Sequence, residues 1–169
     1  MVEKNVVYKG KVKQKGIFDF KDFYQFMYNH MMDENYDVFE DKYWVQIEPG
    51  DTRKIEIIWK AKKEISNYFR YDIEFEWIIL RMKKVKVRKE GKEIQMDTGT
   101  PEIRFTAVLV KDFDNKWNTP LLKFLRRIYD KYVIRTRIED HELKLYQEVT
   151  EALAQAKSFL SIEGQHDIP

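Results

Sequence analysis

Residues 53–65, RKIEIIWKAKKEI, decide the fold class. Apolar side chains recur there at every second position, and charged side chains fill most of the positions between them. A strand with one apolar and one charged face is typical of an antiparallel sheet that covers a core on one side only. The expected inward set is Ile55, Ile57, Trp59, Ala61 and Ile65, and the outward set is Lys54, Glu56, Lys60, Lys62 and Glu64.

The flanking segments extend the same alternation in both directions. Residues 69–80 place five apolar side chains on one face, namely Tyr71, Ile73, Phe75, Trp77 and Ile79. Strands are also predicted at 5–13, 36–48 and 102–111, and a hairpin at 83–96 is closed by Glu90-Gly91. Turns are expected at Pro49-Gly50-Asp51 and at 98–101 (TGTP). The total is about six to seven strands.

Two segments have the three- and four-residue spacing of helices. Residues 19–33 carry a stripe of Phe, Tyr and Met, with Asp19 or Asp22 as the N-cap. Thr119-Pro120 begins a second pattern that runs to about residue 161, which predicts a helix roughly 60 Å long if it is continuous. Such a helix is expected either to kink near 135–138 or to project beyond the sheet, and the tail 162–169 is expected to be flexible. The predicted buried stripe is Leu121, Leu125, Ile128, Tyr132, Leu145, Val149, Ala152, Ala156 and Phe159.

These elements predict an α+β fold, with a curved antiparallel sheet, one N-terminal helical segment and a long C-terminal helix 119–161 on the concave face. The 169 residues fit a single domain over 1–169. No cysteine is present, which excludes disulfides and thiolate sites and fits a cytoplasmic protein. The N-terminus MVEKNVVYKG lacks a signal-peptide core, and no apolar run is long enough to span a membrane.

The order of strand, helical segment, about six antiparallel strands and long C-terminal helix resembles the helix-grip fold of the START/Bet v 1-like superfamily. The resemblance covers most of the chain and rests on element order, not on a diagnostic motif. This chain departs from the family pattern in its longer C-terminal helix, and only Gly50 stands where the family often has a glycine-rich loop. The resemblance implies a cavity between sheet and helix that binds an apolar small molecule, such as a lipid or a sterol.

The sequence contains little that would support a catalytic site or a cofactor site. The histidines are His30, His141 and His166, and no Gly-x-Ser-x-Gly elbow accompanies them, so His30 and His141 are expected to be surface or helix-end residues. Neither 139–142 (EDHE) nor the acidic cluster at 33–41 has the spacing of a metal site, and no phosphate-binding glycine motif occurs. We expect no metal and no cofactor, and no catalytic residue is assigned.

The first functional hypothesis is a non-enzymatic protein that holds an apolar small molecule between the sheet and the C-terminal helix. An aromatic cavity with a few polar anchors suits such a ligand. A solid aromatic core without a cavity is the alternative interpretation of the same residues. The candidate lining residues are Tyr8, Tyr28, Trp59, Tyr71, Phe75, Trp77, Phe105, Tyr129 and Tyr132.

The second hypothesis is an interaction module that binds nucleic acid or an acidic protein partner through two basic runs. The hairpin 81–92 and the helix face 123–137 together offer several phosphate contacts if they share a surface. Lysines that protect a sheet edge are the alternative explanation, and Trp44 and Trp117 are the aromatic residues expected to be exposed. The basic candidates are Lys83, Lys84, Lys86, Arg88, Lys89, Lys92, Lys123, Arg126, Arg127 and Arg135.

A third hypothesis concerns the second half of the long helix. Residues 138–160 carry an apolar stripe that can pair with a second copy of the chain, which would make the protein a helix-mediated homodimer.

Overall fold

The computed structural model describes residues 2–164 and contains one antiparallel sheet of six strands. The strand order is β1-β6-β5-β4-β3, and the short β2 pairs with β6 beyond the end of β1. The predicted α+β class and antiparallel sheet are therefore confirmed. The strands are β1 (Glu3–Lys13), β2 (Gly16–Phe18), β3 (Asp37–Glu48), β4 (Thr52–Glu64), β5 (Phe69–Lys89) and β6 (Lys92–Lys111).

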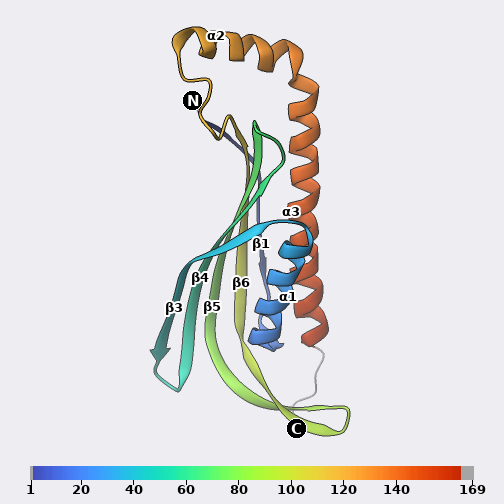
Figure 1. Cartoon of the computed structure of the whole chain (residues 1–169). Helices are drawn as coiled ribbons and strands as arrows, with labels where there is room; N and C mark the ends of the chain where they lie inside the picture. Colours follow the sequence, from blue (N-terminus) through green and yellow to red (C-terminus); the bar gives the residue numbers. More distant parts are fainter. Residues whose placement is uncertain (1, 165–169) are drawn as a thin grey trace.

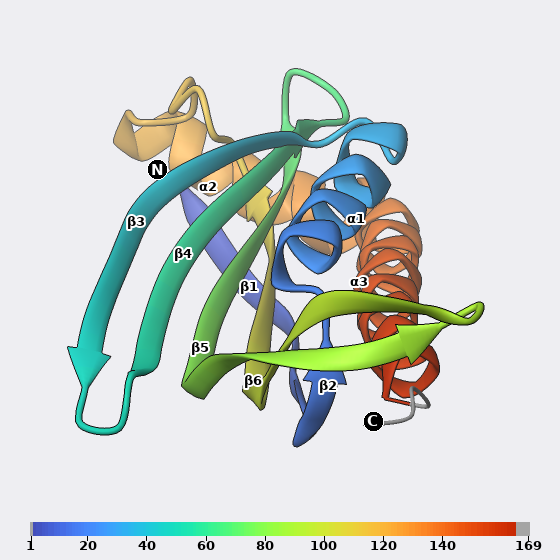
Figure 2. The same ribbon diagram turned by 90° about the horizontal axis from the view of Figure 1, so that it is seen from below.

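Two helices fill the concave face of this sheet, α1 (Phe20–Asp33) and the long α3 (Arg135–Glu163), which lie side by side (Figure 1). Asp19 caps α1, because its side chain accepts a hydrogen bond from the backbone N–H of Asp22 at 3.0 Å. Phe23, Met27 and Met31 recur at four-residue steps along α1 and are fully buried. The sheet curves around both helices, as the view from below shows (Figure 2).

The core between sheet and helices matches the predicted alternation. Ile57, Trp59 and Ala61 of β4 are completely buried, and the inward residues between 71 and 79 of β5 and between 103 and 109 of β6 are at most 1% exposed. From α3 the core receives Leu145, Val149, Ala152, Ala156 and Leu160. Two of these are alanines, and their small side chains let the helix lie close to the large rings of the sheet.

The distal part of the β5–β6 hairpin differs from the expectation. The turn predicted at 98–101 is wrong, because β6 continues through it and pairs with β2 and β5. A bulge between Leu80 and Lys83 of β5 lies opposite, with Arg81 at φ 54°. A Cβ on Gly99 would lie 2.9 Å from the carbonyl oxygen of Leu80, so glycine is needed for close approach of the strands and not for a turn. Beyond the bulge the hairpin curls under the lower ends of α1 and α3 (Figures 1 and 2).

The predicted helix 119–161 consists of two helices. α2 (Pro120–Ile128) is followed by a π-helical turn, η1 (Tyr129–Val133), and α3 starts at Arg135. The break therefore lies just before the predicted kink. α2 runs across one end of the molecule at a steep angle to α3, so only α3 packs on the concave face (Figure 1).

We expect Trp77→Ala to lower the free energy of unfolding by about 3–5 kcal/mol, because Trp77 is 1% exposed and truncation leaves a cavity among tightly packed rings. Trp44→Ala is the matched control, since this indole on β3 is 40% exposed, and its cost should stay below about 1 kcal/mol. Urea denaturation of both variants measures the difference. If both variants lost the same free energy of unfolding, Trp77 would not be part of a tightly packed core.

Candidate functional site

α2 presents its apolar side to the solvent. Thr119 and Pro120 start the helix as predicted, with the Thr119 hydroxyl accepting a hydrogen bond from the Leu122 N–H at 3.3 Å. The prediction that the apolar stripe of this segment is buried is wrong, because its members are between 40% and 71% exposed. We call these residues the apolar band: Leu121, Phe124, Leu125, Ile128 and Tyr132.

Arg126 explains this orientation. It was expected on the basic surface, but it is only 5% exposed and lies between the sheet and α2. Its guanidinium is 2.9 Å from a carboxylate oxygen of Glu3 in β1 and donates to the Tyr68 hydroxyl at 3.0 Å. Asp112, which follows β6, is 3.7 Å away and Asp130 is 3.6 Å away. A buried cation requires such partners, so the side of α2 that carries Arg126 turns inward.

The neighbours of Arg126 extend the network. Lys111, also buried, is 3.1 Å from Glu3 and 3.6 Å from Asp130. The Tyr68 hydroxyl donates to Asp130 at 2.8 Å, and the two oxygens of Asp112 accept the backbone N–H groups of Lys116 and Trp117. Charged groups from β1, β6, the loop after β6, α2 and η1 therefore meet at one end of the sheet.

A row of exposed cations runs beside the apolar band, formed by Lys123, Arg127 and Lys131, which we call the basic band. Arg135 is exposed further along and pairs with Glu139 at 3.1 Å. Asp130 is the one carboxylate in the sequence between residues 119 and 135, and the Arg126 network engages it. The outward side of α2 and η1 is therefore apolar along one half and positive along the other.

The second basic run lies far from the first. The hairpin residues Lys83, Lys86, Arg88, Lys89 and Lys92 are exposed, and Lys84 pairs with the buried Asp97 at 2.9 Å. The hairpin and α2 occupy opposite ends of the molecule (Figure 1). The two basic runs therefore do not form one continuous surface.

The aromatic candidates divide into packed and exposed groups. Trp59, Tyr71, Phe75, Trp77 and Phe105 are at most 1% exposed, and their rings touch: the Trp59 and Trp77 centroids are 4.8 Å apart, and those of Phe75 and Phe105 are 5.0 Å apart. Tyr8 packs edge-on against Tyr146 of α3, Tyr28 against Trp59, and Tyr129 stacks on Trp117. Tyr132 was expected inside but is 71% exposed, because it belongs to the outward band.

His141 has a defined role that the sequence reasoning missed. Its Nδ1 lies 2.8 Å from the hydroxyl of the fully buried Tyr71, and burial lowers the pKa of His141 below its ordinary value. His141 precedes the buried Leu145 by four residues, so its place on the inward stripe of α3 was a usable signal. A hollow of about 350 Å³ opens beside it at the start of α3.

A second polar cluster lies one to two turns further along α3. The Tyr36 hydroxyl donates to Glu148 at 2.6 Å, and Lys63 of β4 donates to the other carboxylate oxygen at 2.9 Å. Burial, together with the nearby Glu148 carboxylate, raises the pKa of Tyr36 well above its usual range. The cluster satisfies polar groups at the helix–sheet boundary, so we assign it a structural role.

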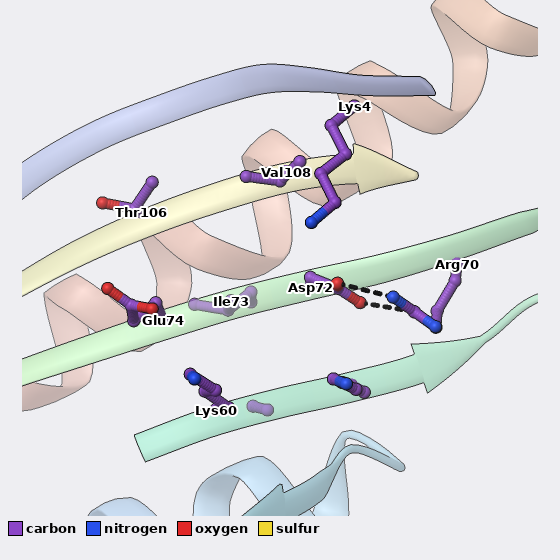
Figure 3. Close-up of a pocket in the computed structure, with 10 residues that line it drawn as sticks. Lys4, Lys60, Arg70, Asp72, Ile73, Glu74, Thr106 and Val108 are labelled. Carbon is purple, nitrogen blue, oxygen red and sulfur yellow. Dashed lines mark hydrogen bonds and ion pairs between the residues drawn. The ribbon is translucent and has the colours of Figure 1, made fainter. Parts of the chain in front are cut away.

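The convex face of the sheet carries a shallow hollow of about 360 Å³ between β1, β6, β5 and β4 (Figure 3). Half of its charged lining residues are paired: Arg70 forms two hydrogen bonds with Asp72 at 2.7 and 2.9 Å, and Lys60 pairs with Asp41 at 2.9 Å. This is the solvent-exposed side of the sheet that the alternation of apolar and charged residues predicts.

Comparison of this chain with protein-family models, with curated proteins and with solved structures found no match. Among residues 2–164, no three His, Asp or Glu side chains are grouped so that they could hold a metal ion. None of the helices described is both long enough and apolar enough to cross a membrane. The exposed apolar and basic side chains on the outward face of α2 are therefore the strongest indication of a function.

Proposed function

We propose that this protein is a peripheral docking module that binds the surface of an anionic lipid bilayer through α2. The observation that carries the proposal is the apolar band, which faces the solvent beside the basic band. Helices that lie in a membrane interface have this design, with Leu and Phe entering the acyl boundary and Lys and Arg remaining at the headgroups.

The position of α2 suits a planar target. It lies across the end of the molecule with no other element beyond it (Figure 1), so the whole band can meet a flat surface at once. Burial of one Leu or Phe side chain contributes about 1.5–3 kcal/mol. Each basic residue near an anionic membrane adds about 1 kcal/mol. The three cations of the basic band therefore supplement the apolar contribution.

Other occupants fit the same face less well. A second copy that packs its α2 antiparallel to this one by twofold symmetry would bring Lys123, Arg127 and Lys131 of both chains together, which places like charges in contact. Nucleic acid would pair with the cations, and Phe124 and Tyr132 offer bases a stacking surface. It would leave the aliphatic side chains Leu121, Leu125 and Ile128 without an apolar contact. An acidic protein with an apolar groove shares the required chemistry, and the experiment below separates it from a bilayer.

The direct experiment is sedimentation with vesicles of phosphatidylcholine that contain phosphatidylserine, and with vesicles of phosphatidylcholine alone. We expect the wild-type chain to bind the anionic vesicles and to lose affinity as salt increases, because salt screens the basic band. Leu121→Glu/Phe124→Glu should weaken this binding at least about tenfold, since it places two charges on the apolar band.

The matched control is Leu143→Glu on α3, an equally exposed leucine (56%) outside α2, and it should bind vesicles as the wild type does. The circular dichroism of every variant is compared to exclude unfolding. The proposal is wrong if the wild type does not bind anionic vesicles. It is also wrong if Leu121→Glu/Phe124→Glu and Leu143→Glu lose affinity for them equally. In the first case an acidic protein partner would be the remaining occupant.

A second candidate function is the binding of an apolar small molecule between sheet and α3, in the manner of the START/Bet v 1-like proteins that the element order resembles. The specific observation in its favour is that the indole N–H group of Trp77 is buried and donates to no acceptor among the described residues. A polar atom of a ligand would satisfy it. Since the surrounding rings touch, such a ligand would have to displace some of them.

Native mass spectrometry of the purified protein tests this candidate. A bound small molecule should appear as a mass above that of the chain, and Ala156→Leu should remove it by filling the space under α3. Leu143→Glu, which changes an exposed position on the same helix, should retain it. Only the unmodified chain mass in the wild type would argue against the candidate.

A further inference from the structure

The hollow beside His141 has a defined composition. It is formed by the turn between β4 and β5, by η1 and by the first two turns of α3, and its volume is about 350 Å³. None of its lining residues carries a carboxylate. They are Ser66, Asn67, Tyr68, Phe69, Tyr129, Ile134, Arg137 and His141.

Two of the side chains that offer hydrogen-bond donors to the hollow belong to α3. Arg137 and His141 are four residues apart, so they lie on the same side of the helix. Arg137 is exposed and forms no ion pair with any residue between 2 and 164. Its guanidinium is therefore available to an anion, which it can bind through two parallel hydrogen bonds.

The Tyr71 hydroxyl fixes the state of His141. Tyr71 is completely buried, and the imidazole Nδ1 is the one hydrogen-bond partner of its hydroxyl among the described residues. A buried hydroxyl donates its proton where an acceptor is present, so Nδ1 accepts and the ring proton resides on Nε2. Nε2 has no partner in residues 2–164 and belongs to a side chain that lines the hollow. Neutral His141 is thereby held as a donor.

The start of α3 adds positive potential at the same place. Ile134 occupies the N-cap position and its side chain cannot accept a hydrogen bond from the helix. The first turn contains no acidic residue, although acids normally occupy this position because the helix dipole is positive there. It contains Arg135 and Arg137 instead. A bound anion would compensate both the dipole and the guanidinium of Arg137.

Ser66 and Asn67 add polar groups, and the other walls are apolar or aromatic. The Phe69 ring lies 4.5 Å from the His141 ring, and Tyr129 enters from the π-helical turn. Single π-helical turns inside helices frequently accompany functional sites. A ligand that fits has an anionic head for Arg137 and His141 and an apolar body for Phe69, Tyr129 and Ile134.

We propose that this hollow is a binding site for a phosphate group carried on an apolar or aromatic body, with Arg137 and the Nε2–H of His141 as its donors. The site is separate from the apolar band and the basic band, and the proposal does not depend on the docking of α2 to a bilayer. The phosphate can belong to a lipid headgroup or to a water-soluble phosphoester.

Amide and imidazole NMR titration of the full chain tests the proposal, with phenyl phosphate, inorganic phosphate and dihexanoyl phosphatidic acid as probes and sodium chloride at matched ionic strength as the reference. We expect saturable shifts confined to residues 66–69, residues 134–138 and the His141 ring. Arg137→Gln should weaken binding at least about tenfold, because a charge-assisted pair is lost.

Tyr71→Phe removes the hydroxyl that fixes the histidine tautomer, so it should weaken binding several-fold while the Arg137 contact remains. Lys157→Gln is the matched control: it removes an exposed cation of the same helix, about five and a half turns beyond Arg137, and should leave binding unchanged. The proposal is overturned if chloride reproduces the shifts, if none of the three probes saturates, or if Lys157→Gln weakens binding as much as Arg137→Gln.

The relative affinities of the probes distinguish the sources of the phosphate. Tighter binding of dihexanoyl phosphatidic acid than of phenyl phosphate supports the site and assigns it to a lipid headgroup. The opposite order supports the site and assigns it to a soluble aromatic phosphoester. Dihexanoyl phosphatidic acid is used below the concentration at which it forms micelles, so no probe presents a lipid surface. A failure of vesicle binding by α2 therefore does not affect this result.

Discussion

The buried guanidinium of Arg126 is the constraint on which the exposed apolar face of α2 depends. A guanidinium remains charged at any ordinary pH, so its removal from water requires carboxylates and hydrogen-bond acceptors around it. Glu3, Asp112, Asp130 and the Tyr68 hydroxyl provide them at one end of the sheet. Because Arg126 belongs to a strongly amphipathic helix, its inward position directs the apolar side of that helix outward.

The two halves of the C-terminal region are thus held by different forces. α3 is attached by apolar burial, with Val149, Ala152 and Ala156 packed against the aromatic rings of the sheet. α2 is attached by ion pairs and hydrogen bonds, which leave its apolar side chains without a partner in the described chain. The π-helical turn η1 connects α2 to α3, and the hollow lined by Arg137 and His141 lies at this connection.

Local patterns in the sequence predicted much of the fold but not its functional face. Alternation at Ile57, Trp59 and Ala61 identified the inward side of the sheet, and Thr119-Pro120 identified the start of α2. Periodicity shows that a helix has an apolar side, yet not what that side contacts. The partners of Arg126 are far apart in the sequence, Glu3 and Asp112 among them, so no local pattern could reveal its burial. His141 was misjudged because its charged neighbours obscured its register with Leu145.

The exposure of single positions on α2 tests this account most directly. The chain contains no cysteine, so one introduced thiol is a unique reporter of accessibility. Cysteine at Leu121 or Phe124 should react with a water-soluble alkylating reagent in the native protein almost as fast as in urea. Cysteine at Leu145, on the buried stripe of α3, should react only after unfolding. Protection of the two α2 thiols equal to that at Leu145 would show that the band packs inward and would contradict the account.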